Sequence, residues 1–311
     1  MIRILLVVAT LTTFDAVAAQ PTAQAGATVG PHAAQAAHIE QLVEIFLTTN
    51  DDAKSEAALS EARRMFEREG IPSVAAVGDS AAYQFVLINM LGQPPDLRLR
   101  FFAGVQKSAA RHRLPADAVI FAEARRRLTA IDIRYATATP SHPELRDQIE
   151  QLSKDDQAVR QKEGFDVTKT AEADRKTAEP LNGIFRRYGV PTYDMVGVQA
   201  ARDFIVMVQH QSPEFRRGVL PRLKVNVDAG QADPGTYAMV YDRTQRDQGK
   251  KQLYGEQLEC SAGKTLELAP VESPATVNLR RAKLGLMRLE IYTRLVRLHS
   301  PDLCGSREAP Q

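Results

Sequence analysis

The sequence lacks an excess of charge of either sign, and it lacks a long apolar run. Its 311 residues include 40 Lys and Arg against 38 Asp and Glu. General nucleic-acid and membrane-surface binders concentrate basic charge, so we expect neither function here. A membrane-spanning helix needs about 20 consecutive apolar residues, and the apolar run at residues 4–14 is too short. We therefore predict no nucleic-acid partner and no transmembrane segment in the mature chain.

The signatures of common hydrolases and metalloenzymes are also missing. The chain has no Gly-x-Ser-x-Gly nucleophile elbow and no His-Glu-x-x-His helix. Its histidines are scattered without the spacing of a metal site. We accordingly predict neither a bound metal nor another cofactor.

The N-terminus has the three parts of a secretory signal. Arg3 supplies the positive charge, residues 4–14 are apolar, and two overlapping small-residue cleavage sites follow at 16–18 and 17–19. No Cys follows the apolar run, so a lipid anchor is not expected. We predict a signal peptide over 1–19 and an exported protein, periplasmic or secreted. Residues 20–36 have few large apolar side chains and are predicted to form a flexible leader.

Only two cysteines are present, Cys260 and Cys304. An exported chain with an even number of cysteines favours a disulfide. Closing this loop is worth about 4 kcal/mol in the chain-entropy account. The bond would hold the tail, residues 301–311, against the region that we predict to be a hairpin.

The chain contains an internal similarity at a constant offset of 119 residues. Nine of twenty positions match between residues 66–85 and 185–204, glycines and prolines included. A second match, Ile39–Leu42 with Ile149–Leu152, has an offset of 110. We therefore predict a degenerate N-terminal repeat over 37–135, a linker at 136–144, and a C-terminal domain over 145–300.

The glycine, proline and N-cap residues within each copy are spaced as the ends of helices are. Gly70 and Gly189, each followed by a proline two positions on, are predicted to end helices. Further helices are expected at 199–211, 213–229 and 234–247, the last two after N-cap residues followed by Pro. Two short strands, Gln252–Cys260 and Lys264–Pro270, would form a hairpin. Asn278 would cap a last helix that is interrupted at Gly285. The predicted fold class is mainly α: two diverged copies of a helical unit, the second with a small β-hairpin and C-terminal helices.

A series of short motifs in the second half resembles an uncharacterised bacterial family, domain of unknown function 6624, over roughly residues 145–292. The motifs are Asp156-Gln157 with Arg160, Tyr188-Gly189-Val190-Pro191, Val196-Gly197, Gln209-His210, Asp242-Arg243, Gln252-Leu253-Tyr254-Gly255-Glu256-Gln257, Arg280-Arg281-Ala282 and Leu284-Gly285-Leu286. The sequence departs from the family pattern at Val190, where an aromatic is usual, and at Glu256, where Thr is usual. The resemblance implies no activity.

Polar residues of the second copy define a candidate site. We place His210 and Asp242 where the first copy has Leu91 and Ala122. Alternation along the first predicted strand would put Gln252 and Tyr254 on one face. The ligand-binding candidates are Gln209, His210, Asp242, Arg243, Gln252, Tyr254 and Gln257.

The same residues are also typical of a buried polar network that only joins a hairpin to helices. Asp156 and Arg160 have the spacing of a solvated helical ion pair.

Because no nucleophile accompanies the candidates, we favour a binding or interaction module that recognises a peptide, glycan or protein ligand in the cell envelope. The alternative is a hydrolase-type enzyme with His210 as general base and Asp242 as its orienting group.

Overall fold

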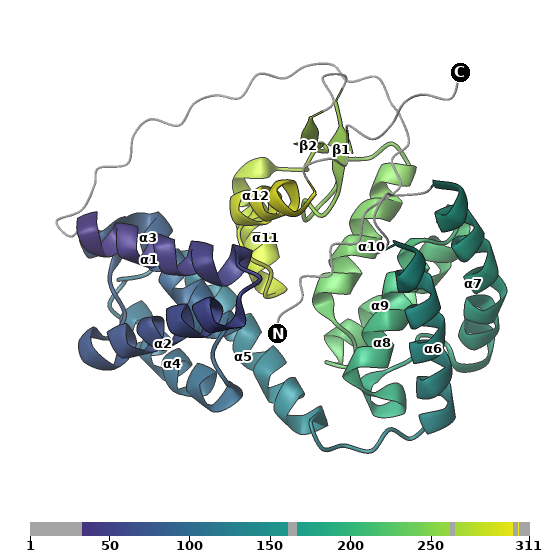
Figure 1. Cartoon of the computed structure of the whole chain (residues 1–311), viewed down its shortest axis with the longest axis horizontal. Helices are drawn as coiled ribbons and strands as arrows, with labels where there is room; N and C mark the ends of the chain where they lie inside the picture. The colour runs from purple at the N-terminus through teal and green to yellow at the C-terminus, as the bar shows by residue number, and fades with distance from the viewer. Residues whose placement is uncertain (1–32, 161–166, 262–264, 301–303, 305–311) are drawn as a thin grey trace. The chain divides into compact units, whose positions relative to one another are not determined.

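The computed structural model describes residues 33–160, 167–261, 265–300 and 304 (Figure 1). The predicted signal peptide lies outside the described residues, as does the leader up to residue 32. The predicted fold class is confirmed, since helices make up most of the described chain and the strands form one small hairpin. In chain order the elements are α1 (Ala33–Thr48), α2 (Asp52–Glu69), α3 (Val74–Leu91), α4 (Pro95–Ala109), α5 (Ala116–Tyr135), α6 (Pro143–Arg160), α7 (Val167–Tyr188), α8 (Tyr193–Gln209), α9 (Pro213–Asp228), α10 (Pro234–Asp247), β1 (Leu258–Cys260), β2 (Leu266–Leu268), a 3₁₀ turn (Pro274–Thr276), α11 (Val277–Lys283) and α12 (Leu289–His299).

The chain divides into two compact units. In the described part, the first unit combines residues 33–130 with 278–300, and the second combines 131–277 with Cys304. The sequence placed 278–300 in the C-terminal domain instead. The physical reason for the difference is twofold. Ala282, Ile291 and Leu295 are part of the hydrophobic core of the first unit. The guanidinium of Arg288 bonds to both oxygens of Asp117, at 2.6 and 2.8 Å, and lies 4.2 Å from the ring centre of Tyr83. These contacts join α12 to α3 and α5.

Two helix termini differ from expectation. Residues 33–36, predicted as leader, already belong to α1. Asn278 lies inside α11 rather than at its N-cap, and its Oδ1 accepts a hydrogen bond from Leu289 N at 2.8 Å. Asn278 therefore caps α12, across the turn that contains Gly285.

The matched positions of the two copies have the same local geometry. Gly78 and Gly197 break α3 and α8 with nearly equal angles, φ 83°, ψ 168° and φ 81°, ψ 170°. Ser73 and Thr192 cap these helices in the same way, and α1 packs on α3 as α6 packs on α8. The origin of the two copies by duplication stays a prediction.

The offset of 119 residues corrects the predicted match of Asp242 with Ala122. It places Glu123, not Ala122, opposite Asp242, and it places Met90 and Leu91 opposite Gln209 and His210. The first copy is therefore apolar at the end of its central helix, whereas its α5 keeps a carboxylate.

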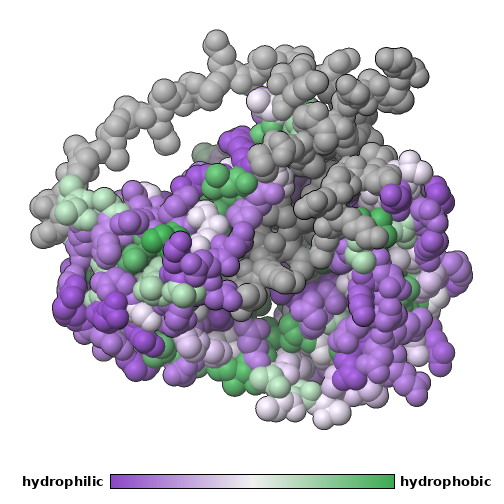
Figure 2. All heavy atoms as spheres, in the orientation of Figure 1, coloured by the Kyte–Doolittle hydropathy of each residue, from purple (hydrophilic) through white to green (hydrophobic). Residues whose placement is uncertain are grey.

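Helix α3 is the core of the first unit. Among the described helices it alone is long and apolar enough to cross a membrane, and 61% of that stretch is buried inside the protein, as in the core helix of a globular unit. On the face seen in Figure 2, polar side chains cover most of the described surface, and apolar side chains form small separate areas.

Helix α8 is the core of the second unit. It packs against α6, α7, α9 and α10, and residues 204–208 are all buried. The predicted starts of α9 and α10 are confirmed: the Ser212 hydroxyl accepts from Phe215 N, and Asp233 Oδ1 accepts from Thr236 N at 2.7 Å. This arrangement fixes where the C-terminal end of α8 lies.

The hairpin forms, but its first strand is shorter than predicted. β1 pairs antiparallel with β2, with Leu258 opposite Leu268. Residues 252–257 form no strand; Gln252 makes a single parallel bridge to Val271, and Gly255 has a positive φ of 81°. The expected alternation of Gln252, Tyr254 and Glu256 on one strand face is therefore wrong.

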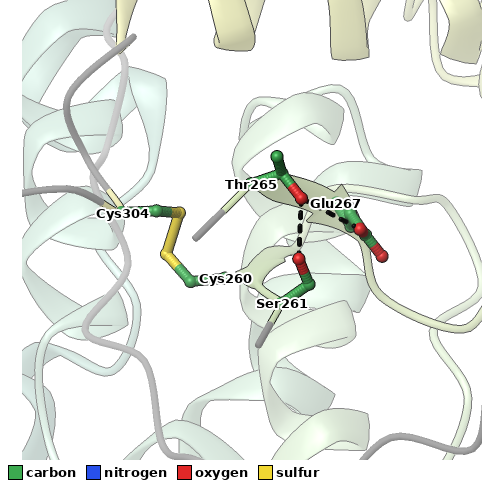
Figure 3. The surroundings of a disulfide bond; sticks show 5 residues. All are labelled: Cys260, Ser261, Thr265, Glu267 and Cys304. Atoms are coloured by element: carbon green, nitrogen blue, oxygen red, sulfur yellow. Dashed lines mark hydrogen bonds between the residues drawn. A yellow bond between two sulfur atoms is a disulfide. The ribbon is translucent and has the colours of Figure 1, made fainter. Parts of the chain in front are cut away.

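The predicted disulfide is present. Cys260, the last residue of β1, bonds to Cys304 (Figure 3). Beside it, the hydroxyl groups of Ser261 and Thr265 lie 2.7 Å apart, and Thr265 donates to Glu267 on β2. The bond holds the chain at residue 304 to the hairpin.

We expect Gly197→Ala to destabilise the protein. The φ and ψ of Gly197 belong to a region that only glycine adopts readily, and a side chain there costs about 1–3 kcal/mol. The matched control is Gly183→Ala, in helical backbone with open space around it, which should raise stability by up to about 1 kcal/mol. Thermal unfolding of both variants checks this; an unchanged midpoint for Gly197→Ala would contradict it.

Candidate functional site

Asp242 holds a loop against α10. Its side chain is fully buried. Oδ1 accepts hydrogen bonds from Leu253 N at 2.7 Å and Tyr254 N at 3.1 Å, and Oδ2 accepts from Tyr254 N at 3.1 Å and Glu256 N at 3.0 Å. Burial raises the pKa of Asp242 to about 6, although these N–H donors favour the ionised form. Every bond goes to backbone of residues 253–256, so this carboxylate organises the chain before the hairpin.

Gln252 and Gln257 extend this loop structure. The amide of the buried Gln252 donates to Gln257 O at 2.9 Å and to Ala269 O at 2.6 Å, and its oxygen accepts from Gln257 N at 2.8 Å. The Gln257 amide donates to Met239 O on α10. Tyr254 packs its ring against Tyr237 and Tyr241. The contacts of four candidates thus form a network that joins the hairpin to α10: Asp242, Gln252, Tyr254 and Gln257.

A second group of polar side chains gathers at the C-terminal end of α8. His210, directly after α8, has a side chain that is 3% exposed, and its Nδ1 lies 3.4 Å from Oδ2 of Asp156 on α6. Arg160, one turn further along α6, donates to Asp156 at 2.8 and 3.1 Å and also to Asp174 on α7. We name Asp156, Arg160, Asp174, Gln209 and His210 the α8-end cluster.

Two expectations from the sequence are corrected by this geometry. Asp156 and Arg160 are not a solvated pair, since their side chains are 0% and 11% exposed. The carboxylate beside His210 belongs to Asp156, whereas both oxygens of Asp242 are bonded to the backbone of residues 253–256. The carboxylate placed to orient His210 is therefore Asp156 on α6, and not Asp242 on α10 as the sequence predicted.

The cluster sets the charge state of its members. Burial disfavours ionisation of Asp156, but His210 and Arg160 outweigh it and hold the pKa of this carboxyl below its ordinary value. Burial lowers the pKa of His210, against the opposing effect of Asp156. A carboxylate whose neighbours favour its ionised form therefore lies next to an imidazole whose burial favours its neutral form.

Two arginines adjoin the cluster. Arg216 of α9 is buried; it donates to Gln209 O at 3.1 Å and to Asp247 at 2.5 Å, and so satisfies a carbonyl group at the end of α8. Arg243 of α10 is also buried, and burial together with the charge of Arg216 lowers its pKa to about 10. Of the predicted site residues, Gln209, His210 and Arg243 lie in this region.

Two members of the cluster have unsatisfied atoms. Gln209 is 1% exposed, and its Oε1 has no hydrogen-bond partner in the described structure. Both ring nitrogens of His210 are likewise buried without a hydrogen bond. Buried polar atoms of proteins nearly always have partners, so these atoms mark the cluster as unlike the Asp242 network.

Sequence reasoning missed Asp174. It lies on α7, whose buried side chains are apolar at Leu181 and Ile184 but, nearer the start of the helix, include Thr177 and Thr170 besides Ala173. This change of polarity along one helix face is the signal that indicates a polar contact at the start of α7. It does not identify the residues on other helices that make the contact.

The sequence of the second half matches one protein family. The family's sequence profile aligns with residues 143–300, just over half of the chain, and is described as a family of unknown function (DUF6624). The chain belongs to this family. The matched span contains the α8-end cluster and the Asp242 network, and it confirms the resemblance drawn from the motifs. No curated protein and no solved structure matches the chain.

We expect Asp242→Asn to lower the thermal midpoint by several degrees. The Asn amide turns an NH₂ group toward backbone N–H donors of residues 253–256, and each buried donor left unpaired costs about 1–3 kcal/mol. In a chain of this size 1 kcal/mol corresponds to roughly 2–4 °C. The control is Asp228→Asn, an exposed carboxylate paired with Lys224. Equal midpoints for the two variants would contradict the structural role of Asp242.

Proposed function

We propose that this is an exported protein that binds a polar ligand of the cell envelope at the α8-end cluster. The observation that carries the proposal is the burial of Gln209 Oε1 and both His210 ring nitrogens without hydrogen-bond partners. A ligand that enters the cluster would supply the missing partners.

The fold itself does not require polar residues at this position. In the first copy Met90 and Leu91 end the corresponding helix and are buried. A buried polar atom without a partner costs about 1–3 kcal/mol. Residues that lower stability in this way are common at binding and catalytic sites, which supports a ligand at Gln209 and His210.

The unsatisfied atoms restrict the ligand chemistry. Gln209 Oε1 requires a hydrogen-bond donor, whereas a neutral imidazole has one donor and one acceptor nitrogen. Hydroxyl and amide groups both donate and accept. Sugar hydroxyls of a glycan and amide groups of a peptide or protein therefore have the donors and acceptors that these atoms lack.

One observation favours a second candidate, a hydrolase-type enzyme. His210 Nδ1 lies 3.4 Å from Asp156, and a neutral imidazole beside a carboxylate is a general base with an orienting group. Within the described residues no hydroxyl or thiol hydrogen-bonds to His210. Binding is therefore the first proposal, and turnover of a glycan or peptide that is abolished by His210→Leu would replace it by the enzymatic one.

Export has its own test. The disulfide between Cys260 and Cys304 is typical of proteins in oxidising compartments. We expect the protein recovered from its native cells to begin at residue 19 or 20, after removal of the signal peptide, and to contain no free thiol. Intact-mass measurement after thiol labelling checks both points. A full-length chain with two labelled thiols would contradict export.

Converting the end of α8 to the residues of the first copy tests the binding proposal. We expect Gln209→Met with His210→Leu to raise the thermal midpoint of the free protein. The change removes buried polar atoms without partners, and each kcal/mol recovered corresponds to roughly 2–4 °C. Differential scanning calorimetry provides the measurement.

The reverse exchange is the matched control. Met90→Gln with Leu91→His introduces polar atoms into the apolar core of the first unit and should lower the midpoint. If the Gln209→Met, His210→Leu variant also melts at a lower temperature, the two polar residues stabilise the fold and the binding proposal is wrong.

A further inference from the structure

Three side chains of the α8-end cluster have the composition of a metal site. Asp156, Asp174 and His210 come from α6, α7 and the end of α8, and each offers one ligand atom within 4.8 Å of the other two. Two carboxylate oxygens and one imidazole nitrogen are ligands that first-row divalent ions accept. Three protein ligands also leave a coordination position open for water or a bound group.

The distance between Asp156 and His210 fits shared coordination better than a hydrogen bond. Nδ1 and Oδ2 are 3.4 Å apart, and the ring nitrogen makes no hydrogen bond. Metal–ligand bonds to zinc are about 2.0–2.2 Å, so two ligands of a tetrahedral ion lie roughly 3.4 Å apart. The ligand atom of Asp174 lies within 4.8 Å of the other two, and this side chain, which is 23% exposed, would shift inward to complete the coordination.

The unsatisfied ring of His210 is an independent sign of a ligand. Its side chain is 3% exposed, and neither nitrogen has a hydrogen-bond partner. A metal bond to Nδ1 would occupy one of these nitrogens. The other ring nitrogen, Nε2, would then be available to the polar ligand.

We propose that Asp156, Asp174 and His210 bind a divalent metal ion of the zinc type, with an open coordination position that faces the polar ligand. This inference rests on the proposed function, because it assigns the ion to the same cluster. The single histidine and the three separate helices explain why the sequence has no metal-binding motif.

When no metal is bound, the positive charge between Asp156 and Asp174 comes from Arg160. Its guanidinium bonds to Asp156 and to Asp174, and so supplies the positive charge that two neighbouring carboxylates require. Arg160 is the last residue of α6 and is 11% exposed. Metal binding therefore requires this side chain to withdraw from at least one carboxylate oxygen, and Arg160 competes with the ion.

Isothermal titration with ZnCl₂ tests the site directly. The untagged full chain, with its disulfide formed and stripped of metal by chelation, should bind one Zn²⁺ with a micromolar or lower Kd. Mg²⁺ and Ca²⁺ should bind much more weakly, because they prefer oxygen ligands throughout. A hundredfold excess of Zn²⁺ over Kd should raise the thermal midpoint by roughly 5–10 °C.

Variants assign the ligands. Asp174→Asn and His210→Leu should each weaken Zn²⁺ binding at least tenfold. Asp155→Asn, which changes an exposed carboxylate next to Asp156 on α6, is the control and should leave Kd unchanged. Arg160→Met should bind Zn²⁺ about tenfold more tightly, because a competing charge is removed.

Three outcomes would overturn the inference: no stoichiometric Zn²⁺ binding, an unchanged Kd in Asp174→Asn, or weaker binding by Arg160→Met. The failure of this inference is distinguishable from failure of the proposed function. If Zn²⁺ does not bind but the Gln209→Met, His210→Leu variant is stabilised, the cluster is a polar-ligand site without metal. If the variant is destabilised as well, both proposals fail.

Discussion

The second unit depends on the burial of the C-terminal part of α8 on all sides. Helices α6, α7, α9 and α10 each pack on α8, and residues 204–208 are all buried, so this part of the helix has to be apolar around its whole circumference. Its last carbonyl groups have no partner within the helix. Arg216 reaches one of them at Gln209 from α9 while it is paired with Asp247 of α10. The end of α8 is therefore a place where charge has to be buried, and the neighbouring helices supply it.

The second unit has two sets of buried polar groups, which differ in how completely they are hydrogen-bonded. Asp242, Gln252 and Gln257 bond to backbone N–H and C=O groups, and this bonding substitutes for regular strand pairing in residues 252–257. The α8-end cluster pairs Asp156 with Arg160, yet leaves Gln209 and His210 with unsatisfied atoms. A network that serves only the fold gains from complete satisfaction. The α8-end cluster, whose hydrogen bonding is incomplete, is therefore the better candidate for function. The sequence does not separate the two sets, because both consist of polar residues.

Local features of the chain were predictable because they depend on neighbouring residues. The ends of α2 and α7 at Gly70 and Gly189, and the caps of α9 and α10 at Ser212 and Asp233, are consequences of backbone angles and side-chain hydrogen bonds within a few residues. The segment 252–257 was mispredicted as strand because its backbone bonds to the side chain of Asp242, a tertiary contact that outweighs local preference. Asn278 was assigned to the wrong helix for a similar reason: it accepts a hydrogen bond from the next helix, across the turn at Gly285.

The sequence by itself determined the helical class, the helix boundaries at glycine and proline, the disulfide partners and membership of the family. Only the tertiary structure decided which polar side chains meet. Asp156, Asp174 and His210 lie on separate helices, and their proximity depends on how α6 and α7 pack on α8. The tertiary structure also decided that the side chain of Arg160 is only 11% exposed and not solvated. The physical reason is that helical periodicity specifies which face is buried, whereas the helix packed against that face determines each side chain's partner.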